Sequence, residues 1–216
     1  MRHIHPVGIH EKFVASGQYE QAHISWSIHQ FPDEAQMIRL DRDMRLSDGT
    51  SILIEAWRSP IAEGGNIERV DVWGFAGYPH RIQQAKARYF IADGSLEVSV
   101  QINQQPQHTA SQPFLADMVL APDLPVFWGY ALRANKPNWV SCLFDFDDEH
   151  AFLPMIHAKT IHLLGDDVVY LGETAHPVQK YLLDNHLVWI DDLGVVLVYE
   201  GDNQHHRVKN YARRAS

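Results

Sequence analysis

Residues 81–103, RIQQAKARYFIADGSLEVSVQIN, decide the fold class. After Ser95 the apolar residues Leu96, Val98 and Val100 alternate with polar ones. Because a period of two places successive side chains on opposite faces of a sheet, this half predicts a strand that is buried on one face. Asp93-Gly94 in the middle is a dipeptide favoured in tight hairpin turns, where both central positions need a positive φ. The stretch therefore predicts a long β-hairpin.

The same alternation appears on both sides of the hairpin. In residues 21–30 (QAHISWSIHQ), one expected face carries Ala22, Ile24, Trp26 and Ile28, and the other carries His23, Ser25, Ser27 and His29. Further expected strands cover residues 51–58, 68–75, 139–147 and 159–164, and short runs follow between turn-forming residues, including Gly165 to Asp167. About a dozen short strands without intervening helices are typical of an antiparallel meander.

Evidence for helix is confined to one segment. Residues 113–121 (PFLADMVLA) have room for two turns of helix, which Pro122 and Pro125 would end. The segment 103–113 is polar, rich in Gln and bracketed by Pro, so it is the best candidate for a linker between two β-rich halves. We expect a mainly β protein: a single large antiparallel, strongly curved sheet, half-barrel or barrel-like, with little helix. Residues 1–216 then form one β-rich domain, and a division near 103–113 is the alternative.

Composition excludes several classes of protein. The chain has 216 residues, of which 45% are hydrophobic, and a single Cys, which argues against a disulfide scaffold or a Cys-rich zinc module. Eighteen Lys and Arg against 27 Asp and Glu give a net charge of −9, so we expect no nucleic-acid partner. No run approaches the roughly 20 apolar residues of a membrane-spanning helix. The amino end lacks the apolar run of a signal peptide, and we therefore expect a cytoplasmic protein.

Fourteen His make metal binding the first chemistry to consider. His3 and His5 would share a face if extended, yet they lie at a chain terminus, where a solvated arm is the favoured interpretation. The acidic run at 145–149 suggests a cation site or paired carboxylates, although a charged hairpin end is favoured. Cys142 alternates in line with two Phe and is expected to be a small core residue. We therefore predict no metal and no cofactor.

Motifs of nucleophilic and nucleotide chemistry are missing from the sequence. It contains no G-x-S-x-G elbow, no P-loop and no dinucleotide-binding fingerprint. We therefore predict no catalytic residue.

Aromatic residues point instead to a ligand. In residues 68–75 (ERVDVWGF), Val70 and Val72 oppose Asp71, Trp73 and Phe75. A second sheet face that carries aromatics either packs against another layer or lines an apolar cavity that holds a ligand. Two loop-like clusters, at 77–81 and at 127–130 with Arg133 nearby, could form a polar mouth suited to a carboxylate, phosphate or sugar headgroup. The candidate ligand-binding residues are Trp57, Trp73, Tyr78, His80, Arg81, Trp128, Tyr130, Arg133 and Trp189.

Residues 163–201, LLGDDVVYLGETAHPVQKYLLDNHLVWIDDLGVVLVYEG, give one resemblance. They resemble the carboxy-terminal meander of the lipoprotein-carrier-like fold and of bacterial putative glycolipid-binding families. In those families a Trp strand ends in an Asp turn and a Gly, as Trp189, Asp191, Asp192 and Gly194 do here. The resemblance implies a half-barrel that holds its ligand on a concave face. Periplasmic lipid carriers are exported, whereas this chain shows no leader, and no functional residue is carried over.

We therefore expect a non-catalytic protein that binds an apolar or amphipathic small molecule, lipid-like or glycolipid-like, on a concave β-sheet. The first alternative is a lipocalin-like enzyme, an isomerase or hydrolase that uses acid/base or metal-assisted chemistry on a hydrophobic substrate in the same cavity. A pair of titratable groups that converge in the cavity, one with a shifted pKa, would favour that alternative. The second is a β-sheet interaction protein or homodimer that buries its aromatic face against a partner.

Overall fold

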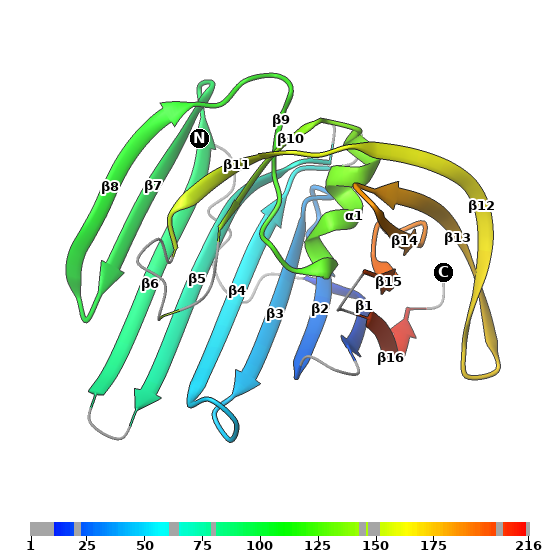
Figure 1. Ribbon diagram of the computed structural model, residues 1–216, viewed down its shortest axis with the longest axis horizontal. Helices are drawn as coiled ribbons and strands as arrows, with labels where there is room; N and C mark the ends of the chain where they lie inside the picture. Colours follow the sequence, from blue (N-terminus) through cyan, green and yellow to red (C-terminus); the bar gives the residue numbers. More distant parts are fainter. Residues whose placement is uncertain are drawn as a thin grey trace.

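A computed structural model describes residues 11–19, 23–60, 65–78, 81–142, 146, 152–201 and 205–214. Within them lie one antiparallel sheet of thirteen strands, a three-stranded sheet and one α-helix (Figure 1). The expected fold class is confirmed: the protein is mainly β, with a single large antiparallel sheet and little helix. The large sheet is not closed into a barrel.

The large sheet joins strands from the two ends of the chain. Its order is β12-β13-β14-β15-β16-β1-β2-β3-β4-β5-β6-β7-β8, and β1 pairs with β16. The first eight strands are β1 (Lys12–Tyr19), β2 (Ile24–Gln30), β3 (Gln36–Met44), β4 (Thr50–Arg58), β5 (Ile67–Tyr78), β6 (Arg81–Ala92), β7 (Ser95–Ile102) and β8 (Gln105–Pro113). The last five are β12 (Ile161–Leu171), β13 (Thr174–Leu183), β14 (His186–Ile190), β15 (Val196–Glu200) and β16 (His205–Arg213).

The hairpin at residues 81–103 forms as expected, from β6 and β7. Its turn residues Asp93 and Gly94 have φ angles of 49° and 74°, the positive values that a two-residue hairpin turn needs. Leu96, Val98 and Val100 are buried on one face.

The two faces of the large sheet have different surroundings. In β4, Ile52, Ile54 and Ala56 are buried, whereas Leu53 and Trp57 on the opposite face are half-buried. The buried face, which we call the inner face, carries the layer formed by α1 (Pro125–Ala134) and the small sheet of β9 (Met118–Leu120), β10 (Asn138–Cys142) and β11 (Pro154–Ala158), and the large sheet curves around α1 (Figure 1). We call the opposite face the outer face.

The helix lies later in the chain than the sequence indicated. Residues 113–121 contain β9 rather than a helix, and α1 begins at Pro125, which was expected to end one. Proline is favoured in the first turn of a helix because its missing N–H has no partner there and its fixed φ suits the helix. The helix ends at Asn135, which takes the left-handed conformation with φ 49°. No α-helix in the described residues has the length and apolar character that crossing a membrane requires.

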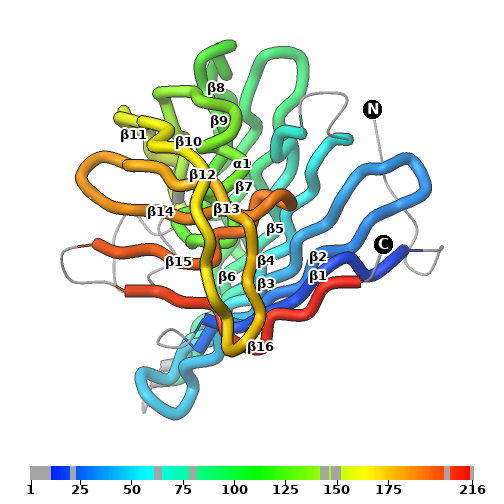
Figure 2. The backbone as a smooth tube through the Cα atoms, turned by 90° about the vertical axis from the view of Figure 1, so that its right-hand side faces the viewer, coloured from blue at the N-terminus to red at the C-terminus, as the bar shows by residue number. Residues whose placement is uncertain are grey.

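Two segments expected to interrupt the sheet belong to it. The Gln-rich segment 103–113, the candidate linker, contains β8, an edge strand paired along its length with β7. Gly165 to Asp167, expected as a turn, lie inside β12, where the pairing with β13 shifts between Leu163 and Gly165. Such a shift is a β-bulge, which bends a strand without ending it. Figure 2 shows β12 and β13 running side by side as one long hairpin, which pairs through β13 with β14.

Candidate ligand site on the outer face of the sheet

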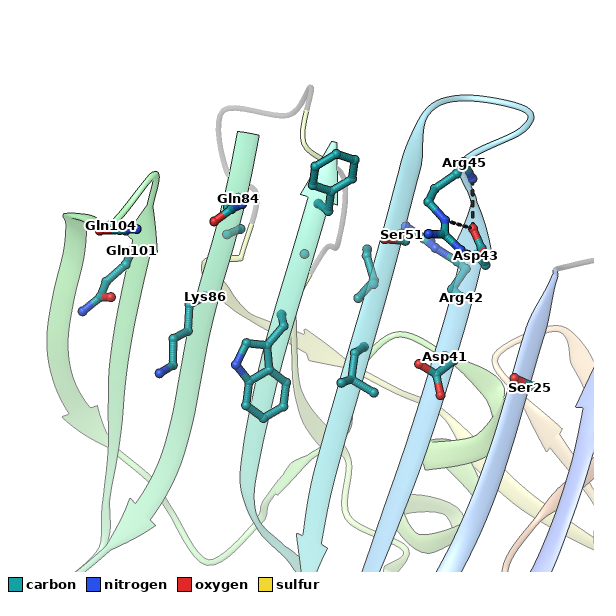
Figure 3. A pocket seen from close by; sticks show the side chains of 16 residues that line it. Ser25, Asp41, Arg42, Asp43, Arg45, Ser51, Gln84, Lys86, Gln101 and Gln104 are labelled. Atoms are coloured by element: carbon teal, nitrogen blue, oxygen red, sulfur yellow. Dashed lines mark hydrogen bonds and ion pairs between the residues drawn. The ribbon is translucent and has the colours of Figure 1, made fainter. Parts of the chain in front are cut away.

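A cavity of about 760 Å³ lies on the outer face, at the end of the sheet that holds the β3–β4 and β7–β8 turns. We call it the outer pocket. Its lining comes from strands β2 to β7 (Figure 3). It consists of Ser25, Asp41, Arg42, Asp43, Arg45, Ser51, Ile52, Leu53, Trp73, Gly74, Phe75, Gln84, Ala85, Lys86, Gln101 and Gln104.

One cross-strand row forms the centre of the outer pocket. Consecutive partners across the six strands are Ser25, Asp41, Leu53, Trp73, Lys86 and Gln101. Five strand spacings of about 4.8 Å make this row roughly 24 Å long. Trp73 lies between Leu53 and Lys86, and Phe75 follows it on the same face. The outer pocket therefore has an apolar floor with polar groups on both sides.

The two sides differ in their hydrogen-bonding groups, as Figure 3 shows. On one side Arg45 donates from Nε and Nη2 to the two carboxylate oxygens of Asp43, at 2.8 and 2.6 Å. The hydrogen bonds from Arg45 lower the pKa of Asp43 to about 2. On the other side stand Lys86 and the amides of Gln84, Gln101 and Gln104. Asp43 is thus a fixed acceptor, whereas the amides can both donate and accept.

A charged row runs beside the Trp73 row on the same face. Arg39, Glu55, Asp71 and Arg88 are consecutive cross-strand partners. The buried carboxylate of Asp71 lies 2.5 Å from Arg69 Nη2 and 2.6 Å from Arg88 Nε, and Glu55 lies 3.6 Å from Arg39 Nη1. Burial raises the pKa of Glu55, against the opposing charge of Arg39. The Arg39–Glu55 pair thus links β3 to β4, and the Asp71–Arg88 pair links β5 to β6, on the face next to Trp73.

The structure places Trp73 in the outer pocket and Trp57 beside it. Trp57 lies on the outer face but outside the lining, where it stacks on Phe31 with ring centroids 5.3 Å apart. Tyr78 and Arg81 are the last paired residues of β5 and β6, and their side chains lie outside the described part, as does all of His80.

The second expected cluster lies on the other side of the sheet. Trp128, Tyr130 and Arg133 belong to α1, which is a helix rather than the loop that was expected. The Arg58 guanidinium lies 3.9 Å from the centre of the Tyr130 ring, and Arg133 donates to the backbone carbonyls of Asp191 and Asp192. Tyr130 and Arg133 therefore fasten α1 to the sheet.

Trp189 lies far along the sheet from Trp73, in β14. Its Nε1 donates to Asp167 at 2.8 Å, and Lys180 Nζ lies 4.7 Å from its ring centre. It packs with Val169 and Val178 of the β12–β13 hairpin in the apolar core. Trp189, the first residue of the motif behind the family resemblance, thus bonds the β12–β13 hairpin to β14.

Most polar groups of the outer pocket were not among the sequence candidates. Alternation alone places Gln101 on the polar face of its hairpin, but it does not reveal that Asp41 and Lys86 flank Trp73. That proximity depends on the register between β3 and β4, β4 and β5, and β5 and β6, which alternation within one strand does not give.

Most residues that the sequence analysis considered as metal ligands lie outside the described part of the chain. His3, His5, Asp145 and residues 147–149 lie outside the described residues. The described ranges contain no group of three or more His, Cys, Asp or Glu that could hold a metal ion.

Comparisons with family models, with curated proteins and with solved structures found no match.

Proposed function

We propose that the protein binds a neutral amphipathic small molecule, a sugar or a glycoside, in the outer pocket. The observation that carries the proposal is Trp73, a half-buried indole at the centre of a six-strand row, with Leu53 beside it and polar groups at both ends. An aromatic ring offers a large rigid apolar surface at low entropic cost. A pyranose ring has an apolar C–H face that covers such a surface, and hydroxyls around its edge.

The side chains around Trp73 suit hydroxyl groups. Carboxylates accept, Gln amides both donate and accept, and Ser hydroxyls do the same, so a polyhydroxylated edge finds partners of both kinds. The lining carries two negative charges, on Asp41 and Asp43, and three positive ones, on Arg42, Arg45 and Lys86, and Arg45 is bonded to Asp43. Because both signs are present and differ by only one charge, a neutral ligand with hydroxyl groups fits better than an ion of high charge.

The size and position of the outer pocket support a small ligand. Its volume of about 760 Å³ falls inside the range of roughly 300–1,000 Å³ of small-molecule sites. The proposal keeps the glycolipid-like ligand expected from the sequence and the face of Trp73 and Phe75 that was expected to hold it, but this face is the outer one and not a concave one. The inner face lies against α1 and the core, whereas the outer face leaves Trp73 and Phe75 half-buried.

Isothermal titration calorimetry with n-octyl β-D-glucopyranoside, below its micelle concentration, and with methyl β-D-glucopyranoside tests the proposal, and a glycan array extends it to other sugars. We expect saturable binding to at least one sugar. Trp73→Ala should weaken it at least about tenfold, which corresponds to about 1.4 kcal/mol.

Trp57→Ala is the matched control, since it removes the same side chain from the same face outside the outer pocket. It should change the affinity less than about twofold, as expected for a residue without ligand contact. No binding to any glycan, or equal losses in the two variants, would contradict the proposal.

A further inference from the structure

Three side chains on the outer face have the arrangement of a catalytic triad. Ser27 and His29 lie two positions apart in β2, so they project from the same face of the strand. Ser27 Oγ lies 3.0 Å from His29 Nε2, which is hydrogen-bonding distance. His29 Nδ1 lies 3.6 Å from the carboxylate of Glu11, the residue directly before β1. A hydroxyl, an imidazole and a carboxylate thus follow one another in the order that activates a serine.

The two ring nitrogens of His29 contact different partners. With its proton on Nδ1, the ring donates toward Glu11 and leaves Nε2 to accept the proton of the Ser27 hydroxyl. The contact of 3.6 Å is longer than a hydrogen bond, and catalytic contacts often tighten only when substrate binds. The His29 ring is half-buried and lies edge to face with Phe13, with ring centroids 6.4 Å apart. This packing limits how the imidazole can turn.

A cation lies opposite Ser27. Arg39 is its cross-strand partner in β3, and the Cβ atoms of such partners lie about 4.5–5.5 Å apart. A guanidinium has five N–H donors, more than the contacts of Arg39 with Asp41 at 3.4 Å and Glu55 at 3.6 Å use. When a serine attacks a carbonyl group, the carbonyl oxygen gains negative charge, and nearby donors stabilise that charge. Arg39 therefore lies next to the position where such donors are needed.

Apolar side chains lie on both sides of His29. Its cross-strand partners are Phe13 in β1 and Met37 in β3. Phe13 is 40% exposed, and Met37 is half-buried. Trp57 in β4 continues the strip as the partner of Met37. A substrate with an apolar group can therefore bury that group beside the imidazole.

We infer that Ser27, His29 and Glu11 hydrolyse a small uncharged carboxylic ester, whose apolar group packs against Phe13 and Met37. The three residues lie outside the lining of the outer pocket, so this activity does not depend on the proposed sugar binding. The sequence predicted no catalytic residue because Ser27 has no G-x-S-x-G elbow around it. The approach of Glu11 to His29 depends instead on the pairing of β1 with β2.

The reaction needs only water as a second reactant. Ser27 Oγ bonds to the ester carbonyl carbon, and its proton passes to His29 Nε2. The bond from that carbon to the alcohol oxygen then breaks, and the departing oxygen takes the proton from His29. Water attacks the acyl-serine and gives a proton to His29, the bond to Ser27 Oγ breaks, and His29 returns the proton to that oxygen. Glu11 holds the ring and exchanges no proton.

Labelling of the unaltered protein with diisopropyl fluorophosphate tests the nucleophile directly. This reagent phosphorylates an activated serine, and mass spectrometry of peptic fragments locates the adduct. We expect one adduct, on Ser27, formed in step with the loss of hydrolysis of p-nitrophenyl butyrate. Absence of the adduct from Ser27 in the wild-type protein would overturn the inference, whether or not any variant folds.

Variants assign the roles of the three residues. Ser27→Ala and His29→Gln should each lower kcat/KM for p-nitrophenyl butyrate at least about a hundredfold, as expected for loss of the nucleophile or its base. Glu11→Gln should lower kcat and leave KM unchanged, because Glu11 positions the ring and touches no substrate.

Two matched variants control for other serines and imidazoles. Ser99→Ala alters a half-buried Ser of β7, and His162→Gln alters an exposed His of β12. Both should keep the wild-type rate and the adduct on Ser27. Undiminished hydrolysis by folded Ser27→Ala or His29→Gln would show that other groups cleave the ester and would also overturn the inference.

Discussion

The imidazole of His206 gives the folded protein a stability that depends on pH. Burial between Tyr199 and Tyr19 lowers its pKa, and the neighbouring His205 lowers it further. Unfolded His has a pKa of about 6.5. Between that value and the lower folded pKa, the unfolded chain binds more protons than the folded one. The contribution of His206 is therefore complete above about pH 6.5 and is lost as the pH falls through the folded pKa.

Urea unfolding at several pH values between 7.5 and 5 measures this effect. We expect the free energy of unfolding to fall on acidification, and to fall less in His206→Gln, which cannot take up the proton. His162→Gln, at an exposed position, should keep the wild-type pH dependence. Equal slopes in wild type and His206→Gln would show that His206 does not contribute.

Individual residues show which features of the candidate site the sequence could predict. Alternation around residues 68–75 placed Trp73 and Phe75 opposite Val70 and Val72, and the structure has them on those faces. The pattern could not show that Trp73 is next to Lys86 in space, since adjacency comes from pairing between strands. Tyr130 and Arg133 are residue types that suit a ligand headgroup, which is why the sequence suggested a site there. Their actual partners, Arg58 and the turn at Asp191, lie 50 or more positions away in the chain, so no local pattern reveals them.

Helix α1 is held against the sheet by a close backbone contact at Gly129. A Cβ atom at this position would lie 2.0 Å from the carbonyl oxygen of Gly194, in the turn between β14 and β15. Helix propensity alone favours Ala over Gly by about 1 kcal/mol. Overlap with a fixed backbone oxygen opposes this gain, and overpacking of a core costs about 1–3 kcal/mol. Gly129→Ala should therefore destabilise the protein despite its better propensity.

Thermal and urea unfolding of Gly129→Ala test this contact. The matched control is Ala134→Gly, at the half-buried end of the same helix, where the loss of about 1 kcal/mol should follow propensity alone. An unchanged or higher midpoint for Gly129→Ala would mean that helix and turn separate easily.

The sequence predicted an element correctly where the element carries its own turn signal, and incorrectly where tertiary packing decides. The β6–β7 hairpin carries its own turn signal in Asp93-Gly94, so its position followed directly. Pro125 is compatible with either end of a helix, and only the packing of α1 on the sheet decides between them. At Gly165 a turn-forming composition produces a bulge, because β13 pairs on both sides of it.

At the scale of the whole molecule, the ends of the described chain meet in the middle of the sheet. β1 and β16 are neighbours. Five strands, β12 to β16, lie on one side of their junction, and eight, β1 to β8, lie on the other. Terminal segments usually fray because nothing holds them. Here both strands are paired on each side, Ala15 and Val208 are buried, and Tyr19 donates through its hydroxyl to the Val196 carbonyl at 2.9 Å.

Native-state hydrogen exchange should therefore invert the usual pattern. Amides of β1 and β16 should exchange slowly, close to the rate of global opening. The edge strand β8, which among the described strands pairs with β7 alone, should exchange fast. Mass spectrometry of peptic fragments resolves these strands, and the central β4 serves as the protected reference. If β16 exchanged as fast as β8, the junction of the two ends would open on its own. Strands β12 to β15 would then form a unit separate from β2 to β8, and the sheet would not unfold as one body.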